Sequence, residues 1–137
     1  MYLLRTFSCR IALVTGANRG IGFEISKQLA SNGVKVILTA RDVKRGNEAV
    51  ENLNAAGYSD VIFHQLDLED SASISTLVDF ITNQFGKLDI LVNATYIKKL
   101  IKIFINYIID VSSKPNFCIK IGDNFTIFPL WNYMLNF

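Results

Sequence analysis

The stretch "VTGANRGIG" (residues 14–22) follows a short apolar run at 11–14 and precedes apolar residues at helical spacing. Its glycines, Gly16, Gly20 and Gly22, form the pattern G-x-x-x-G-x-G. At a strand-to-helix junction the first glycine allows a sharp turn, the second lets backbone approach a pyrophosphate, and the third lets the helix pack closely. The stretch therefore predicts a dinucleotide site at a helix N-terminus, with an unliganded glycine-rich turn as the alternative.

Outward from this loop, strand and helix patterns alternate as far as Asn93. The first helix carries Ile21, Ile25 and Leu29 at the spacing of one helical face, and Asp42 can cap the second helix. The βαβαβαβ order predicts an α/β fold of the Rossmann type, with a doubly wound parallel sheet that is incomplete. We expect strands at 11–14, 34–38, 61–66 and 88–92, and helices over 21–33, 42–57 and 70–86, the last capped by Asp70 or Ser71.

Residues 94–137 differ from the part before them. Ile, Asn, Phe, Lys and Tyr dominate, there is a single glycine, and apolar residues follow no amphipathic period. The first 93 residues carry 9 basic and 10 acidic side chains, whereas the remaining 44 carry 5 and 2. We therefore divide the chain into a nucleotide-binding Rossmann half-domain, 1–93, and a divergent, irregular tail, 94–137, which is expected to be non-native or poorly ordered.

The end of the second strand selects between the two nicotinamide cofactors. An NAD site usually presents a carboxylate here to the ribose 2′-hydroxyl. This strand instead ends in Arg41, with Arg45 one helical turn later and Arg19 in the glycine loop. Guanidinium groups bind phosphate bidentately, so three of them predict NADP(H). Asp42 favours NAD, but its position also suits a helix cap. The alternative role for Arg19 and Arg45 is that of solvated surface residues.

The third strand ends in "HQLDLED", which contains two further candidates. Asp67 stands at the carboxyl end of the strand, where it is expected to face the ligand crevice and contact adenine, or else to cap the next helix. Leu68 follows it in the same candidate site. His64, the single histidine, is interpreted as structural or exposed and not as catalytic.

The motifs "TGANRGIG", "LTARD", "HQLDLED" and "GKLDILVN" occur in an order and spacing that resemble the short-chain dehydrogenase/reductase family. The closest resemblance, over 10–93, is to plant carbonyl reductases of the salutaridine reductase and neomenthol dehydrogenase type. It implies NADPH as hydride donor, a ketone or aldehyde as substrate, and a monomer for the full-length enzymes. The positions that it assigns to the cofactor site are Gly16, Asn18, Arg19, Gly20, Ile21, Gly22, Arg41, Arg45, Asp67, Leu68 and Asn93.

The resemblance fails after Asn93, which matches the first asparagine of the family's Asn-Asn-Ala-Gly segment. The chain continues Ala94-Thr95-Tyr96, so the second asparagine and the glycine are missing. In the family a tyrosine protonates the carbonyl oxygen, a lysine four residues on lowers the pKa of that tyrosine, and a serine holds the substrate. No tyrosine of this chain has a lysine four residues on. Tyr96 and Lys99 resemble the family's tyrosine and lysine, and Ser112 and Ser113 resemble its serine segment. We interpret both similarities as coincidences.

Two hypotheses account for the tail. In the first, the chain is a truncated and catalytically inactive reductase, with Asn93 as the remnant of the active site. In the second, the tail is genuine and supplies a strand or an apolar face. The product is then an NADP(H)-binding module or a non-catalytic partner of a full-length reductase, associating through the open strand edge at 90–92.

The remaining features exclude other classes of function. A net charge of +2 gives no support to nucleic-acid binding. There is no metal-ligand spacing, no secretory signal and no run long enough to span a membrane. Cys9 and Cys118 are interpreted as thiols in a reducing compartment, so a cytoplasmic location is expected.

Overall fold

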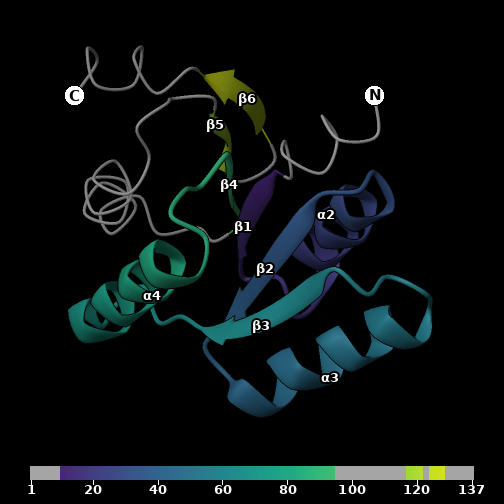
Figure 1. The fold of residues 1–137 in the computed structure, drawn as a ribbon, viewed down its shortest axis with the longest axis horizontal. Coiled ribbons are helices and arrows are strands. Elements are labelled where there is room, and N and C mark those ends of the chain that lie inside the picture. The colour runs from purple at the N-terminus through teal and green to yellow at the C-terminus, as the bar shows by residue number, and fades with distance from the viewer. Residues whose placement is uncertain (1–9, 95–116, 122–123, 129–137) are drawn as a thin grey trace.

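The computed structural model describes residues 10–94, 117–121 and 124–128. Its main feature is a parallel sheet whose strands alternate with helices, which confirms the predicted βαβαβαβ order and the doubly wound α/β class (Figure 1). The sheet order is β3-β2-β1-β4. The elements are β1 (Ile11–Thr15), α2 (Gly20–Ser31), β2 (Lys35–Ala40), α3 (Val43–Ala55), β3 (Val61–Gln65), α4 (Ser71–Gln84) and β4 (Ile90–Asn93).

The register brings the carboxyl ends of the strands to one edge of the sheet. Leu13 of β1 lies opposite Ile37 of β2 and Leu91 of β4, and all three pairings in the sheet are parallel. The chain adds β2 and β3 on one side of β1 and then returns to place β4 on the other side. Ligands of open α/β sheets bind at such a reversal, beyond the carboxyl ends of the strands.

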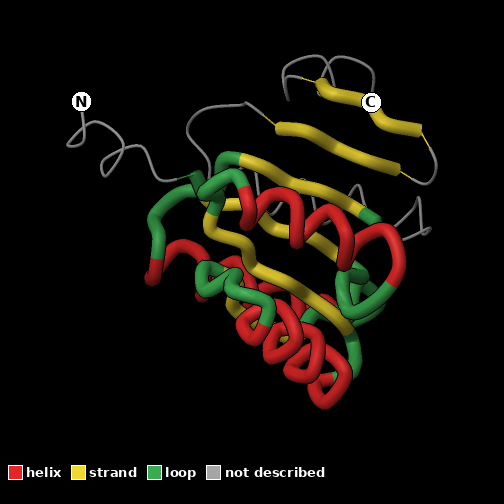
Figure 2. Tube along the Cα trace, turned by 90° about the vertical axis from the view of Figure 1, so that its right-hand side faces the viewer, coloured by secondary structure: helices red, strands yellow, loops and turns green. Residues whose placement is uncertain are grey.

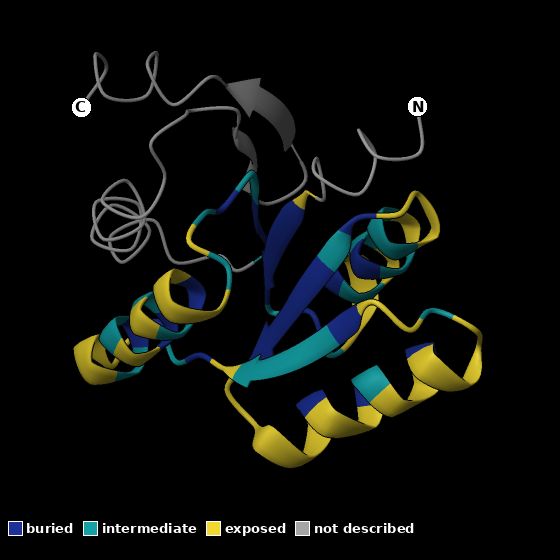
Figure 3. Ribbon diagram, viewed as in Figure 1, coloured by how far each residue is buried: buried dark blue, intermediate teal, exposed yellow. Residues whose placement is uncertain are grey.

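Two apolar clusters cover the two faces of the sheet. They lie between the strands and the helices that pack against them (Figure 2). On one face, Leu13 and Ile37 pack with Leu77 of α4. On the other, Val14 packs with Leu53 of α3, and apolar residues of α2 lie against the same cluster. Successive residues of a strand point to opposite faces of the sheet. A sheet that is covered on both faces therefore requires strands that are apolar at every position. Burial is accordingly concentrated in β1, β2 and β4 and in the inner faces of the helices, whereas β3 is mostly half-buried (Figure 3).

The buried face of α2 differs from the expected one. Ile21 is 51% exposed, whereas Gly22 and Ser26 are the buried residues of this helix. Ile25 and Leu29 are half-buried. The face that packs is therefore shifted by one residue, because a glycine at position 22 allows the first turn of α2 to lie directly against the loop backbone.

The strand predicted at 88–92 begins at Ile90, and Asp89, the residue before it, is bonded to the start of β1 through both its side chain and its backbone. The Asp89 carboxylate Oδ2 accepts a hydrogen bond from Ile11 N at 2.8 Å, and Asp89 N donates to Ile11 O at 3.0 Å. Lys87 Nζ lies 3.2 Å from the same carboxylate oxygen. This reciprocal pair fixes the start of β1 to the start of β4.

Replacing Asp89 by alanine is expected to lower the free energy of unfolding by about 1–2 kcal/mol, because the N–H of Ile11 loses a charged acceptor in a partly buried position. Lys87→Ala is the matched control, since the Lys87 side chain is 45% exposed and its loss is expected to change stability by less than about 0.5 kcal/mol. Urea denaturation followed by circular dichroism measures both. Equal effects of the two substitutions would contradict the role given to Asp89.

The tail contains regular structure where an irregular segment was expected. Within it the structure describes β5 (Phe117–Ile121) and β6 (Asn124–Phe128), an antiparallel pair. The β-branched and aromatic residues of this segment are typical of strands, which accounts for the difference. β5 lies beside β4 without joining its hydrogen-bonded sheet. Tyr96, Lys99, Ser112 and Ser113 lie outside the described residues.

Candidate cofactor site

The glycine loop leaves β1 through two glycines in the left-handed region. Gly16 follows the last residue of β1 directly and has a φ of 57°, and Gly20, the first residue of α2, has a φ of 63°. Side chains are disfavoured in this region, so the sharp turn requires glycine. Between the two, Ala17 N donates to Thr39 O at 3.0 Å. The loop is therefore held to the neighbouring strand, β2.

Gly22 brings α2 against the backbone of the loop. A Cβ atom at this position would lie 2.7 Å from Gly16 O and 3.0 Å from the Cα of Ala17. Both atoms belong to the main chain and cannot turn away as a flexible side chain can. This contact is the physical basis of the close helix packing predicted for Gly22, the third glycine of the motif.

The N-terminus of α2 differs from those of the other two helices that the structure describes. The N-cap of α3 is Asp42, which accepts from Arg45 N at 3.0 Å, and the N-cap of α4 is Asp70, which accepts from Ala72 N at 3.0 Å. The N-cap of α2 is Arg19, whose side chain makes no capping hydrogen bond. The first-turn N–H groups of α2, at the positive end of the helix dipole, are thus left for an external acceptor.

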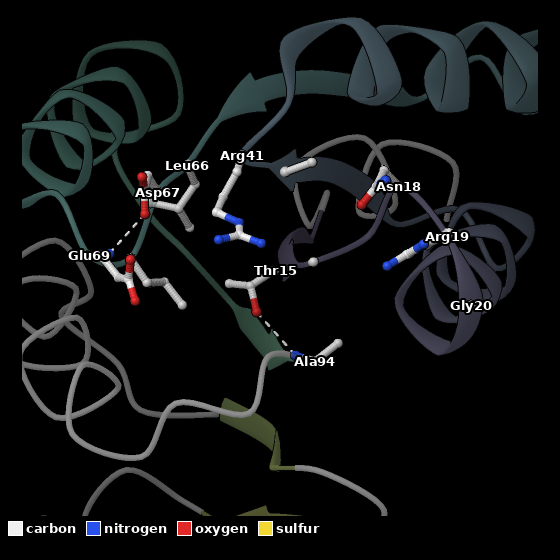
Figure 4. Close-up of a pocket in the computed structure, with 12 residues that line it drawn as sticks. Thr15, Asn18, Arg19, Gly20, Arg41, Leu66, Asp67, Glu69 and Ala94 are labelled. Atoms are coloured by element: carbon white, nitrogen blue, oxygen red, sulfur yellow. Dashed lines mark hydrogen bonds between the residues drawn. The ribbon is translucent and has the colours of Figure 1, made fainter.

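A cavity of about 500 Å³ opens beside this helix end, beyond the carboxyl ends of all four parallel strands (Figure 4). Its walls combine small and apolar residues of the strand ends with charged groups of the loops. This is the composition expected for a site that holds a flat ring system and phosphates. The lining residues are Thr15, Gly16, Asn18, Arg19, Gly20, Ala40, Arg41, Leu66, Asp67, Leu68, Glu69 and Ala94.

The three arginines expected at one spot are divided between two hollows. Arg41 extends from the end of β2 into the cavity, and the guanidinium of Arg19 points toward it from the glycine loop (Figure 4). Arg45 instead lines a smaller hollow of about 260 Å³, between the loop and α3. Asn18 and Arg19 line both hollows, which are therefore adjacent. The separation arises because Arg45 lies in the first turn of α3, beyond the cap at Asp42.

The sequence left open whether Asp42 and Asp67 cap helices or contact the cofactor. Asp42 acts as a helix cap. Asp67 does not cap α4, because Asp70 occupies that position. Its Oδ1 accepts from Glu69 N at 3.0 Å, and its own N–H donates to Ser73 Oγ at 2.9 Å. Asp67 therefore lies in a hydrogen-bonded turn at the end of the cavity opposite Arg19 (Figure 4).

Asn93 lies behind the cavity wall rather than in it. Its side chain is buried, and its Oδ1 accepts from Thr15 Oγ1 at 2.8 Å. Thr15 Oγ1 in turn accepts from Ala94 N at 3.0 Å. These bonds join the ends of β1 and β4 and place Thr15 and Ala94 at the cavity surface (Figure 4).

Comparison with known proteins identifies this architecture. The family model described as short chain dehydrogenase matches residues 10–106, which is more than half of the chain. The chain belongs to the short-chain dehydrogenase family. The match to the family model extends beyond Asn93, the residue at which the recognisable family motifs end.

Relatives within this family include plant reductases. Salutaridine reductase of Papaver somniferum is 61% identical over 85 residues, which are 61% of this chain and 27% of that enzyme. (+)-Neomenthol dehydrogenase of Arabidopsis thaliana is 60% identical over 87 residues, 61% of this chain and 29% of that enzyme. The crystal structure of a metagenomic short-chain oxidoreductase in complex with NADP gives a TM-score of 0.59 at 38% identity and covers 64% of this chain and 39% of that one. The chain spans less than a third of the length of the curated relatives that it matches.

Within this short-chain dehydrogenase fold, most of the residues proposed from the sequence line the cavity. The exceptions have other positions: Ile21 is exposed on the first turn of α2, Gly22 packs beneath the loop, Arg45 lines the adjacent hollow and Asn93 lies behind the wall. The lining residues that sequence reasoning missed are Thr15, Ala40, Leu66, Glu69 and Ala94. Four of these end a strand or directly follow one, and that position is a signal that could have identified them.

His64 lies outside the cavity lining. It is half-buried on β3, its ring centroid is 4.8 Å from that of Phe80, and its Nδ1 is 2.8 Å from Gln65 O. Among the described residues there is no group of three or more His, Cys, Asp or Glu arranged to hold a metal ion. The helices in that part of the chain are too short or too polar to cross a membrane.

Proposed function

We propose that this chain binds NADP(H) in the cavity at the strand ends and that the 137 residues do not themselves reduce a carbonyl substrate. The observation that carries the first part is the N-terminus of α2. Its N–H groups have no capping side chain, and they open beside a cavity that also contains Arg19 and Arg41. This combination suits a pyrophosphate at the helix end and a further phosphate nearby.

The choice of NADP(H) over NAD(H) rests on the end of β2. The residue that faces the cavity there is Arg41, while the carboxylate of Asp42 accepts a hydrogen bond from the backbone of α3. A guanidinium binds the 2′-phosphate, whereas a carboxylate at this position would repel it. Asp67 and the apolar side chains of Leu66 and Leu68 are suited to hold the adenine ring. A related short-chain oxidoreductase has been crystallised in complex with NADP, which supports the same assignment.

A nuclear magnetic resonance titration with NADPH tests where the cofactor binds. We expect the backbone amide resonances of Gly20, Ile21 and Gly22 to shift strongly, because they form the first turn of the uncapped helix. The amides in the first turn of α4 serve as the internal control, because Asp70 already caps that helix. Shifts of similar size at both helix ends, or none at the glycine loop, would contradict the proposal.

The absence of catalysis is proposed from the sequence. None of the tyrosines in the 137 residues has a lysine four positions on, and positioned proton donors contribute about 10²- to 10⁴-fold to a rate. The purified chain with NADPH and a panel of ketones and aldehydes is therefore expected to show no oxidation of NADPH at 340 nm above a protein-free control. Turnover that is proportional to the concentration of the chain would overturn this part of the proposal.

Association with a full-length reductase is a second candidate function. It is supported by the position of β4 at the end of the four-stranded sheet, where β5 lies beside it without hydrogen-bonding to it as a sheet strand. Edge strands pair readily with other chains. Analytical ultracentrifugation of the chain mixed with a full-length plant carbonyl reductase is expected to give a faster-sedimenting species if this candidate is correct. Independent sedimentation of the two proteins would remove it.

A further inference from the structure

Arg41 is the single residue between the end of β2 and the cap of α3, and its neighbours on both sides are fixed. Before it, Ala40 O accepts from Leu66 N at 3.0 Å, which continues the pairing of β2 with β3. After it, the carboxylate of Asp42 accepts from the first turn of α3, and Asp42 O accepts from Gly46 N at 3.0 Å. The peptide group that joins Arg41 to Asp42 is therefore the joint between two rigid elements.

The exposed side chain of Gln65 is hydrogen-bonded to this joint. Gln65 is paired with Ala40 in the sheet register, and its side-chain Nε2 donates to Arg41 O at 3.0 Å. The side chain thus extends the strand pairing by one residue beyond the end of β2. Gln65 does not line the cofactor cavity, so it has no direct contact to offer a ligand bound there.

We infer that Gln65 is a positioning residue for recognition of the cofactor 2′-phosphate, acting through Arg41. This inference rests on the proposed binding of NADP(H). The hydrogen bond to Arg41 O sets the plane of the Arg41–Asp42 peptide, and that plane helps to set the direction in which the Arg41 side chain leaves the backbone. A bidentate contact between guanidinium and phosphate depends on this direction. NADH has no 2′-phosphate, so its affinity is expected to depend much less on the position of Arg41.

The test compares the dissociation constants of NADPH and NADH for the full 137-residue chain, with Gln65→Met and Gln65→Glu as variants. Gln65→Met keeps the length of the side chain but removes the donor, and Gln65→Glu places an acceptor opposite the Arg41 carbonyl. Gln84→Met is the matched control, because Gln84 is an exposed glutamine in the last turn of α4, away from the cavity. Circular dichroism verifies that each variant is folded.

Gln65→Met is expected to weaken NADPH binding about threefold to tenfold, the effect of one hydrogen bond, and to change NADH binding by less than about twofold. Gln65→Glu is expected to weaken NADPH binding at least as much, and Gln84→Met to leave both affinities unchanged. Equal weakening of NADPH and NADH would indicate a merely structural role and overturn the inference, as would an unchanged affinity for NADPH. If the wild-type chain itself fails to bind NADPH, the proposed function fails and this inference fails with it.

Discussion

Gly22→Ala is expected to abolish measurable NADPH binding and to lower the free energy of unfolding by about 1–3 kcal/mol, the usual effect of overpacking a close contact. The added methyl group would lie 2.7 Å from Gly16 O, so either the first turn of α2 or the loop must move. Both hold the N–H groups proposed to bind the pyrophosphate. An NADPH fluorescence titration measures the binding, and urea denaturation measures the stability.

Gly33→Ala is the matched control for this substitution. Gly33 follows the other end of α2 with a φ of 79°, and a Cβ atom there would meet no atom within 4 Å. Alanine in the left-handed region is strained by roughly 1 kcal/mol, so this variant is expected to lose stability but to keep its affinity for NADPH. The close contact at Gly22 would be irrelevant to binding if both alanine variants retained the wild-type affinity.

Arg41→Glu is expected to raise the dissociation constant of NADPH by about 100-fold while changing that of NADH by less than about threefold. The substitution removes a charge-assisted contact, which contributes about 1.5–3 kcal/mol, and adds repulsion of the 2′-phosphate. Lys44→Glu makes the same change of charge on the exposed first turn of α3 and does not alter the cavity lining. Isothermal titration calorimetry of both variants with both cofactors measures the effect.

The comparison with Lys44→Glu separates a specific contact from a general change in electrostatic potential. Surface charges act over about 10 Å at moderate ionic strength, so the control is expected to weaken NADPH binding only slightly and mainly at low salt. If Arg41→Glu and Lys44→Glu had equal effects, the 2′-phosphate would have to be bound elsewhere, and the adjacent hollow lined by Arg45 would become the better candidate.

Sequence patterns predicted the fold because strands buried on both faces and capped helices leave strong local signals. The run ending at Val14 and the caps at Asp42 and Asp70 are of this kind. The exposure of Ile21 was not predictable in this way, because it depends on a backbone contact made by Gly22. The tertiary bonds between Asp89 and Ile11 are likewise invisible in a local pattern.

The sequence predicted those residues of the candidate site that belong to recognisable motifs. The glycine loop, Arg41 and Asp67 all lie at the cavity, as their positions at strand ends indicate. The separation of Arg45 from Arg41 depends on the path of α3 around its cap, which no motif encodes. Gln65 is an extreme case, because its hydrogen bond joins residues 24 positions apart and leaves no periodic trace in the sequence.

The central claim is that these 137 residues form a site for NADP(H), and calorimetric titration of the purified wild-type chain with NADPH and with NADH tests it most directly. The account predicts saturable binding of one NADPH per chain, tighter than that of NADH by at least about tenfold, the effect of one phosphate contact by Arg41. A folded chain that binds neither cofactor, or that binds both equally well, would contradict it.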